Sequence, residues 1–413
     1  MRRRSTASRD SELEAIDRAV GNRFISDWYA ECFSRFSAAP GSIVRVGAYH
    51  HPATYTVSPR LMRHRHLAAL AAPVILLAVA GCSTEAAPPA GDTVDSASAA
   101  ATTDSTGGDT APAAVAATPP GSENRTPNEM GRIPVLEYHL IVPEEKGQFT
   151  RTPQQLRADL EELHRRGYRP VNMVDVIDKK IQNLPKGVSP VVLVFDDASP
   201  SHFRYIERNG KLEIDPTSAV GILEKFSDEH PDWPRRAVFC MLPAAQAGRS
   251  FFGDKGIEGQ KTEWRFPKLQ FLHKQGYELC NHTLYHERLD RAGSRVQEFV
   301  ARGDMAIDSA VPGYRVRTFA LPLGMWPNQR DLAWKGSWKD PKSGRTISYD
   351  YDVVLEVSGS PNVSIYHPDF DPHSFNRQIM YRNALVNTLN QLEKEGPAGR
   401  YVSDGDPRTI AKP

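Results

Sequence analysis

The stretch SPVVLVFDDAS, residues 189–199, decides the fold. Its apolar run, residues 191–195, predicts a strand that is covered on both faces, as the strands of a parallel sheet are. Two carboxylates, Asp196 and Asp197, follow directly where this strand ends. Adjacent like charges beside a buried strand cost free energy unless a cation or strong hydrogen bonds compensate them. We therefore expect a cation site formed with residues from elsewhere in the chain.

Strand and helix patterns alternate around this stretch, from Gly131 onward. Thr152 predicts a helix start, because Pro153 suits the first helical position and Gln155 completes a capping box. The predicted strands cover residues 133–139, 168–173, 190–195, 236–242, 277–282, 317–324 and 351–357. One helix is predicted to begin at Thr152, and three more are predicted around residues 218–226, 266–276 and 294–307. Such alternation predicts an α/β sheet or barrel, whose ligands bind at the carboxyl ends of the strands.

A second informative stretch, residues 62–81, has the features of a signal peptide. Two arginines precede an apolar run from Leu67 to Ala80, which is too short for the roughly 20 residues of a membrane span but suits a signal-peptide core. The ending VAGC, residues 79–82, resembles the lipobox of bacterial lipoproteins. That resemblance implies cleavage before Cys82 and attachment of lipid to its sulfur.

The position of this signal predicts the domain organisation. We expect residues 1–61 to be a mis-called N-terminal extension, because a signal peptide stands at the start of a chain, here at Met62. Residues 82–130 would be the lipidated cysteine and a disordered linker, since the tract that follows Cys82 is rich in Ala, Ser, Thr and Pro and has no aromatic residue. Residues 131–413 would form the folded domain, anchored to the cell membrane and facing the periplasm or the exterior.

Charge and cysteine content exclude other classes. The net charge is +1 at pH 7 without a basic stripe, so we expect no nucleic-acid partner. None of the four cysteines forms a CxxC pair. Cys240 and Cys280 fall on strands expected to be neighbours, and we expect buried thiols there rather than a disulfide, whose geometry is demanding.

Two histidines supply the missing cation partner. His282 and His286 have i, i+4 spacing and would share one face if the turn after their strand is helical. Imidazoles at that spacing can hold one metal ion, and an added carboxylate gives three protein ligands with a position left for water. Because this pair follows one strand end and the two aspartates follow another, a shared metal site is predicted.

These motifs together resemble a known family. VFDDA (194–198) resembles its first motif, TFDDG; HTLYH (282–286) resembles its H-[ST]-x-x-H motif; and FALPLG (319–324) resembles its FAYPYG form. The family is that of the NodB-like polysaccharide deacetylases, carbohydrate esterase family 4, and the opening IPVLEYH resembles its extracellular members, here of lipoprotein type. The resemblance covers roughly residues 131–380 and implies a distorted (β/α)7 barrel.

The resemblance also implies roles for particular residues. Asp197, His282 and His286 would bind a divalent metal, with Zn2+ expected, and Asp196 would be the general base. The family's general acid has no clear counterpart. The further residues proposed to line the site or bind substrate are His139, Asn281, Leu323, His367, His373 and Arg377, of which His367 and His373 are candidates for the general acid. Two departures stand out: Ala198 replaces a glycine and Leu323 replaces an aromatic residue.

The activity implied is a metal-dependent hydrolase that removes N-acetyl groups from an envelope or extracellular glycan, of peptidoglycan or poly-N-acetylglucosamine type. Its expected partners are therefore an acetylated polysaccharide and, through the lipid anchor, a membrane. Two alternatives remain open: an O-acetyl polysaccharide esterase with the same site, and a catalytically silent glycan- or metal-binding lipoprotein.

Overall fold

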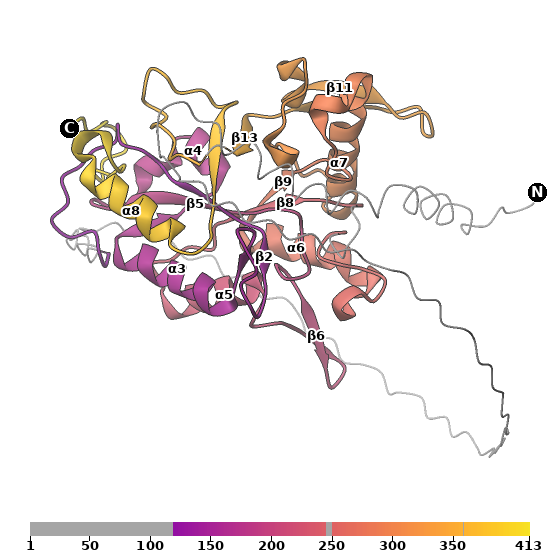
Figure 1. Cartoon of the computed structure of the whole chain (residues 1–413), viewed down its shortest axis with the longest axis horizontal. Coiled ribbons are helices and arrows are strands. Elements are labelled where there is room, and N and C mark those ends of the chain that lie inside the picture. Colours follow the sequence, from indigo (N-terminus) through magenta and orange to yellow (C-terminus); the bar gives the residue numbers. More distant parts are fainter. Residues whose placement is uncertain (1–118, 245–249, 358) are drawn as a thin grey trace, which may run out of the picture. The chain divides into compact units, whose positions relative to one another are not determined.

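Seven parallel strands close into a barrel in the computed structural model, which describes residues 119–244, 250–357 and 359–413 (Figure 1). In order around the ring they are β1 (Val135–Tyr138), β14 (Phe375–Ile379), β13 (Val353–Val357), β10 (Thr318–Ala320), β9 (Glu278–Asn281), β8 (Val238–Met241) and β5 (Ser189–Phe195). The ring closes because β5 pairs in parallel with β1. A further strand, β4 (Tyr168–Pro170), pairs with the first half of β5. The predicted distorted (β/α)7 barrel is confirmed.

Helices and small two-stranded sheets surround the strands of the barrel. The helices are α3 (Pro153–Arg165), α4 (Met173–Ile177), α5 (Ala219–Glu229), α6 (Arg265–Gln275), α7 (Val296–Ala310) and α8 (Ala384–Lys394). The additional strands are β2 (Leu140–Ile141) with β3 (Thr150–Arg151), β6 (Tyr205–Arg208) with β7 (Lys211–Ile214), and β11 (Lys335–Lys339) with β12 (Thr346–Asp350). The predicted capping box is confirmed, since Thr152 Oγ1 accepts from the Gln155 N–H and Gln155 Oε1 accepts from the Thr152 N–H.

The strands bury both of their faces, which explains their continuous apolar sequences. Val194, Cys240 and Cys280 belong to one buried cluster inside the barrel, and Leu193 and Phe239 belong to another that packs under the helices. Successive side chains of a strand point to opposite faces. Residues two positions beyond an inward side chain therefore also point into the barrel, and this rule places the site described below.

Cys240 and Cys280 form a disulfide, so the prediction of free thiols was wrong. The two residues are direct neighbours in the β8–β9 register, with Cα atoms 4.4 Å apart, and both side chains are fully buried. The sequence indicated neighbouring strands, but the bond depends on the register. In this register both cysteines point into the barrel at the same level, within the Cα separation that a disulfide spans.

The strand that closes the barrel, β14, was not predicted. Its sequence FNRQI carries three polar residues, so it lacks the apolar pattern of a buried strand. The structure nevertheless buries Arg377 completely. An inward-facing arginine is tolerated there because its guanidinium pairs with Asp196 and lies beside Glu137, as described below.

The folded domain begins earlier than residue 131. Glu129, a residue of the predicted linker, is fully buried. Its carboxylate accepts hydrogen bonds from the Tyr401 hydroxyl (3.0 Å) and the Ala411 N–H (2.9 Å). Residues 119–130 thus belong to the domain, because contacts with the chain's C-terminal segment order a stretch that has few apolar residues of its own.

The predicted extension 1–61, the signal peptide 62–81 and Cys82 lie outside the described residues. In the part of the chain that the structure describes, no helix combines the length and the apolar character needed to cross a bilayer.

Glu278, at the start of β9, makes the stability of the fold depend on pH. Burial raises its pKa to about 7, although Thr318 Oγ1 and the Val174 N–H donate to it. In the unfolded chain this carboxyl ionises near the ordinary glutamate pKa of 4.5, at lower pH than in the native state. The native state therefore binds more protons between these two values, and the free energy of unfolding should fall as pH rises through that interval, by roughly 3 kcal/mol in total.

Urea unfolding between pH 4 and 8 measures this effect. In Glu278→Gln the amide oxygen can accept from the Val174 N–H and the amide nitrogen can donate to Thr318 Oγ1, so both contacts can remain while the side chain cannot ionise. The variant should lose that part of the pH dependence, and an unchanged profile would show that Glu278 is ionised in the native state.

Candidate active site

The candidate site lies at the carboxyl ends of β5 and β9. Asp196 lies two residues beyond the inward Val194, and His282 lies two residues beyond the inward Cys280, so both side chains point into the barrel mouth. After Asp196 the backbone turns sharply, with φ of 75° at Asp197 and 46° at Ala198. Alanine thus adopts the left-handed conformation for which glycine is suited, at a cost of about 1–2 kcal/mol.

Asp197, His282 and His286 converge, as the sequence predicted for the metal ligands. Asp197 Oδ1 lies 3.6 Å from His282 Nε2 and 3.5 Å from His286 Nε2. The centroids of the two imidazole rings are 4.8 Å apart. His282 Nδ1–H donates to the Ala320 carbonyl oxygen at 2.8 Å. That hydrogen bond fixes the tautomer in which Nε2 presents its lone pair to the site.

This donor set fits a divalent ion of zinc's preferences. Zinc bonds of about 2.0–2.2 Å in a tetrahedron would place neighbouring donor atoms about 3.3–3.6 Å apart, which includes the Asp197–histidine separations found here. Two imidazole nitrogens and one carboxylate oxygen also leave one tetrahedral position for water or substrate.

A loop rather than a helical turn joins the two histidines, so that part of the prediction was wrong. The backbone has positive φ at Thr283 (64°) and His286 (62°), which no α-helix contains. Asn281 stabilises this loop from behind. Its Oδ1 accepts from the Thr283 N–H at 2.8 Å, while its Nδ2 donates to the Val300 carbonyl and to Asp304 Oδ1. The Asn281 side chain therefore stabilises the loop that carries the two histidines by bonding to the backbone of that loop.

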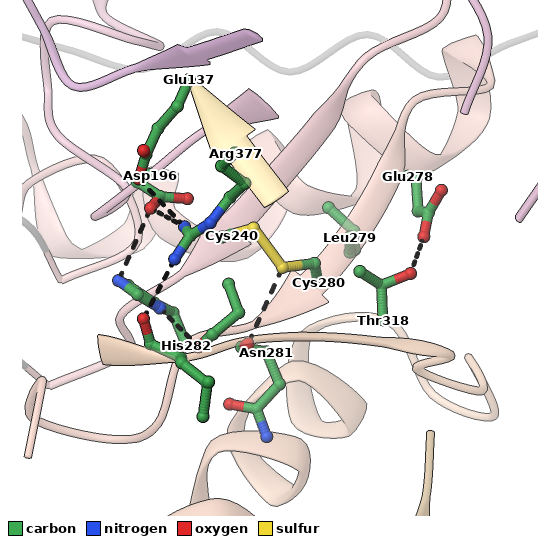
Figure 2. The surroundings of a disulfide bond; sticks show 12 residues. Glu137, Asp196, Cys240, Glu278, Leu279, Cys280, Asn281, His282, Thr318 and Arg377 are labelled. Carbon is green, nitrogen blue, oxygen red and sulfur yellow. Dashed lines mark hydrogen bonds and ion pairs between the residues drawn. A yellow bond between two sulfur atoms is a disulfide. The ribbon is translucent and has the colours of Figure 1, made fainter. Parts of the chain in front are cut away.

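Asp196 is held by a buried arginine (Figure 2). The Arg377 guanidinium contacts Asp196 Oδ2, lies 3.1 Å from Glu137 Oε1 and donates to the Leu321 carbonyl at 3.0 Å. Arg377, which the sequence analysis proposed as a site-lining residue, thus makes an orienting contact with a carboxylate. The other oxygen, Asp196 Oδ1, is buried and has no hydrogen-bond partner among the described residues.

The pKa values of the two neighbouring acids, Asp196 and Glu137, are shifted in opposite directions. Burial alone would raise the pKa of Asp196, but the adjacent Arg377 holds that pKa well below its usual range. Burial raises the pKa of Glu137 well above its usual range, and the negative charge of Asp196 adds to this effect. Asp196 is therefore the carboxylate that the site keeps ionised, whereas the pKa of Glu137 is shifted toward its protonated form.

His139 lies beside these carboxylates, and its neighbour His202 was not predicted. His139 Nε2 is 3.8 Å from Glu137 Oε1, and the edge of its ring meets Phe149. Its pKa is lowered by burial, against the opposing effect of Asp197 and Asp196. His202, which is fully buried, uses Nε2 to contact the His139 carbonyl oxygen. In the sequence, His202 is visible only as a histidine six residues after Asp196. A single histidine carries no pattern that distinguishes a residue of the site from one that packs in the core.

The other predicted lining residues have contacts elsewhere. His367 interacts with Asp369, and His373 stacks on Trp334 at 4.4 Å. Both belong to the connection to β14, and Asn362 in that connection pairs with Ile133, at the amino ends of the strands. Leu323 is half-buried in the short turn η6 (Pro322–Gly324) that follows β10.

Among the described residues, two further His/carboxylate groups have ligand atoms close together, but an arginine is paired with a carboxylate in each. Asp232 in the group His164–His230–Asp232 is paired with Arg169, and Asp196 in the group Glu137–His139–Asp196 is paired with Arg377. A guanidinium bound to the carboxylate opposes a second cation at the same place. The group around Asp197 is therefore the one that we assign to a metal ion.

Comparisons with known proteins find similarity among solved structures. No protein-family model and no curated protein matches the sequence. The deacetylase PplD of Streptococcus pyogenes is similar over 63% of this chain and 97% of its own, with 16% identity and a TM-score of 0.44. IcaB of Ammonifex degensii is similar over 62% and 94%, with 18% identity and a TM-score of 0.42. A polysaccharide deacetylase of Bacillus cereus is similar over 62% and 68%, with 16% identity and a TM-score of 0.42. The fold assignment rests on the strand order of the chain itself.

Proposed function

We propose that this chain is a divalent-metal-dependent hydrolase that removes N-acetyl groups from a glycan of the cell envelope, of peptidoglycan or poly-N-acetylglucosamine type. One observation carries the proposal: a three-donor group of Asp197, His282 and His286 adjoins an ionised aspartate that is held by a buried arginine. The likeness of the motifs to the NodB-like deacetylases supports the choice of substrate class.

The residues divide the chemistry among them. A divalent ion in such a site lowers the pKa of water and polarises a carbonyl group. Asp196 accepts the proton of the attacking water through Oδ1, because Arg377 occupies Oδ2 and keeps the carboxyl ionised. His139 lies 3.8 Å from Glu137 Oε1 and is not one of the three assigned metal ligands, and we assign to it the delivery of a proton to the leaving amine.

Export to the envelope is part of the same proposal. The predicted lipid attachment at Cys82 would tether the domain to the membrane, with the domain in the periplasm or outside the cell. The Cys240–Cys280 disulfide supports this location, because structural disulfides form and persist in oxidising compartments and are rare in the cytosol.

An acetate-release screen with the purified full chain tests the function. With zinc present, we expect acetate from N-acetylglucosamine oligomers or from peptidoglycan. Acetate from O-acetylated xylan alone would favour the esterase alternative. Zinc binding without turnover of any acetylated glycan would favour the silent glycan-binding alternative, and either result would overturn the proposal.

His139→Ala tests the assignment of the proton donor. We expect kcat on an N-acetylated oligomer to fall by about 10²-fold or more, because loss of a positioned acid or base costs that much. Zinc affinity should change little, since His139 is not among the three assigned ligands. His373→Ala is the matched control and should keep wild-type kcat. The reverse pattern, with loss of activity only in the His373 variant, would show that the donor comes from the connection to β14.

A further inference from the structure

The disulfide lies directly beneath the candidate metal site. Cys280 on β9 precedes His282, the residue directly after β9, by two positions, so both side chains point into the barrel, one level apart (Figure 2). Cys240 is at the same level on β8, and both cysteines are fully buried. The bond therefore lies inside the barrel, where it is shielded from solvent.

The strand that bears the disulfide's first cysteine, β8, connects the two halves of the metal site. On one side β8 pairs with β5, which leads into Asp197, through Val194↔Val238 and Phe195↔Phe239. On its other side β8 pairs with β9, which leads into His282. Any change in the spacing between β8 and β9 therefore changes the distance between His282 and Asp197.

The strand β9 depends strongly on β8 for its position. Its pairing with β8 extends over four register positions, whereas its pairing with β10 consists of the single position Phe319↔Asn281. Even the His282 N–H bonds toward β8, donating to the Met241 carbonyl at 3.2 Å. The covalent bond thus reinforces the side of β9 that holds the ligand in place.

We propose that the Cys240–Cys280 disulfide is a positioning element of the metal site, which holds β9 against β8 so that His282 Nε2 stays within reach of Asp197. The proposal rests on the proposed metal-dependent function. It gives the bond a role in metal affinity that is separate from its contribution to the stability of the barrel. On the other side of β9, the backbone pairs with β10 at a single position. Side-chain hydrogen bonds from His282 to the Ala320 carbonyl and from Thr318 to Glu278 add to that pairing.

Zinc affinity of the full chain, measured by competition with a chromophoric chelator, tests this role. Both cysteines are replaced together, as C240A/C280A, because a single remaining thiol could itself bind zinc. We expect the dissociation constant to rise at least tenfold. Val353→Ala is the control: Val353 is a fully buried residue of the same interior cluster on β13, a strand that carries none of the three ligands. It should lower the melting temperature while leaving zinc affinity within about twofold of wild type.

A mutant cycle identifies the residue through which the bond acts. In the His282→Ala background, loss of the disulfide should have no further effect on zinc affinity, because the positioned ligand is already absent. If C240A/C280A does not fold, C240V/C280A refills part of the void and replaces it. Unchanged zinc affinity in the pair variant, an equal loss in Val353→Ala, or failure of both pairs to fold would overturn the positioning role. A wild-type chain that binds no zinc would instead overturn the metal site itself.

Discussion

Replacing Asp196 by Asn should lower acetate release by about 10²- to 10⁴-fold, the usual contribution of a general base. An amide in this place cannot accept the proton of the attacking water, although its size and shape are unchanged. Zinc content should remain that of the wild-type chain, because the three assigned ligands are intact. Steady-state kinetics and metal analysis of the same preparation measure both quantities.

Asp159→Asn is the matched control for this variant. Asp159 on α3 is also a buried carboxylate paired with an arginine, Arg151. It additionally accepts a hydrogen bond from the Tyr138 hydroxyl and is not part of the candidate active site. Both substitutions break a buried ion pair, which costs about 3–5 kcal/mol of stability. Only the Asp196 variant should lose turnover. If both variants lost turnover in proportion to their loss of folded protein, Asp196 would be a structural residue.

His282→Ala should abolish tight zinc binding, and activity with it. Only two protein ligands would remain, so the loss should exceed the roughly 10–100-fold that removal of an outer-shell partner costs. Equilibrium dialysis against a zinc buffer measures the affinity without reference to turnover. Added zinc at high concentration should restore only part of the activity.

His164→Ala serves as the control for this second experiment. It removes an imidazole from the other histidine-rich group, where His164 Nε2 hydrogen-bonds to Asp232 at 3.0 Å. Zinc stoichiometry and affinity should be unchanged in this variant. If His164→Ala lost the ion and His282→Ala kept it, the metal would belong to the group at the end of α3, and the proposed mechanism would fail.

Much of the fold was predictable from local sequence. The apolar run 191–195, the capping box at Thr152 and the alternation that follows predicted the buried strands, the first helix and the barrel, and the structure confirms them. These features could be recognised because the periodicity of apolar residues and the capping of helices depend on residues that are close together in the chain. The strand β14 was missed because its buried arginine looks like a surface charge until its partners are known.

The sequence by itself determined that two carboxylates end one buried strand and two histidines follow another, since each motif is a property of a short segment. Only the tertiary structure decided how they are used. It placed Arg377 against Asp196 across 181 residues of chain, set the register that joins Cys240 to Cys280, and brought His139 rather than His367 or His373 beside the carboxylates. Charge compensation and strand register depend on contacts between distant segments, and barrel closure is the step that creates those contacts.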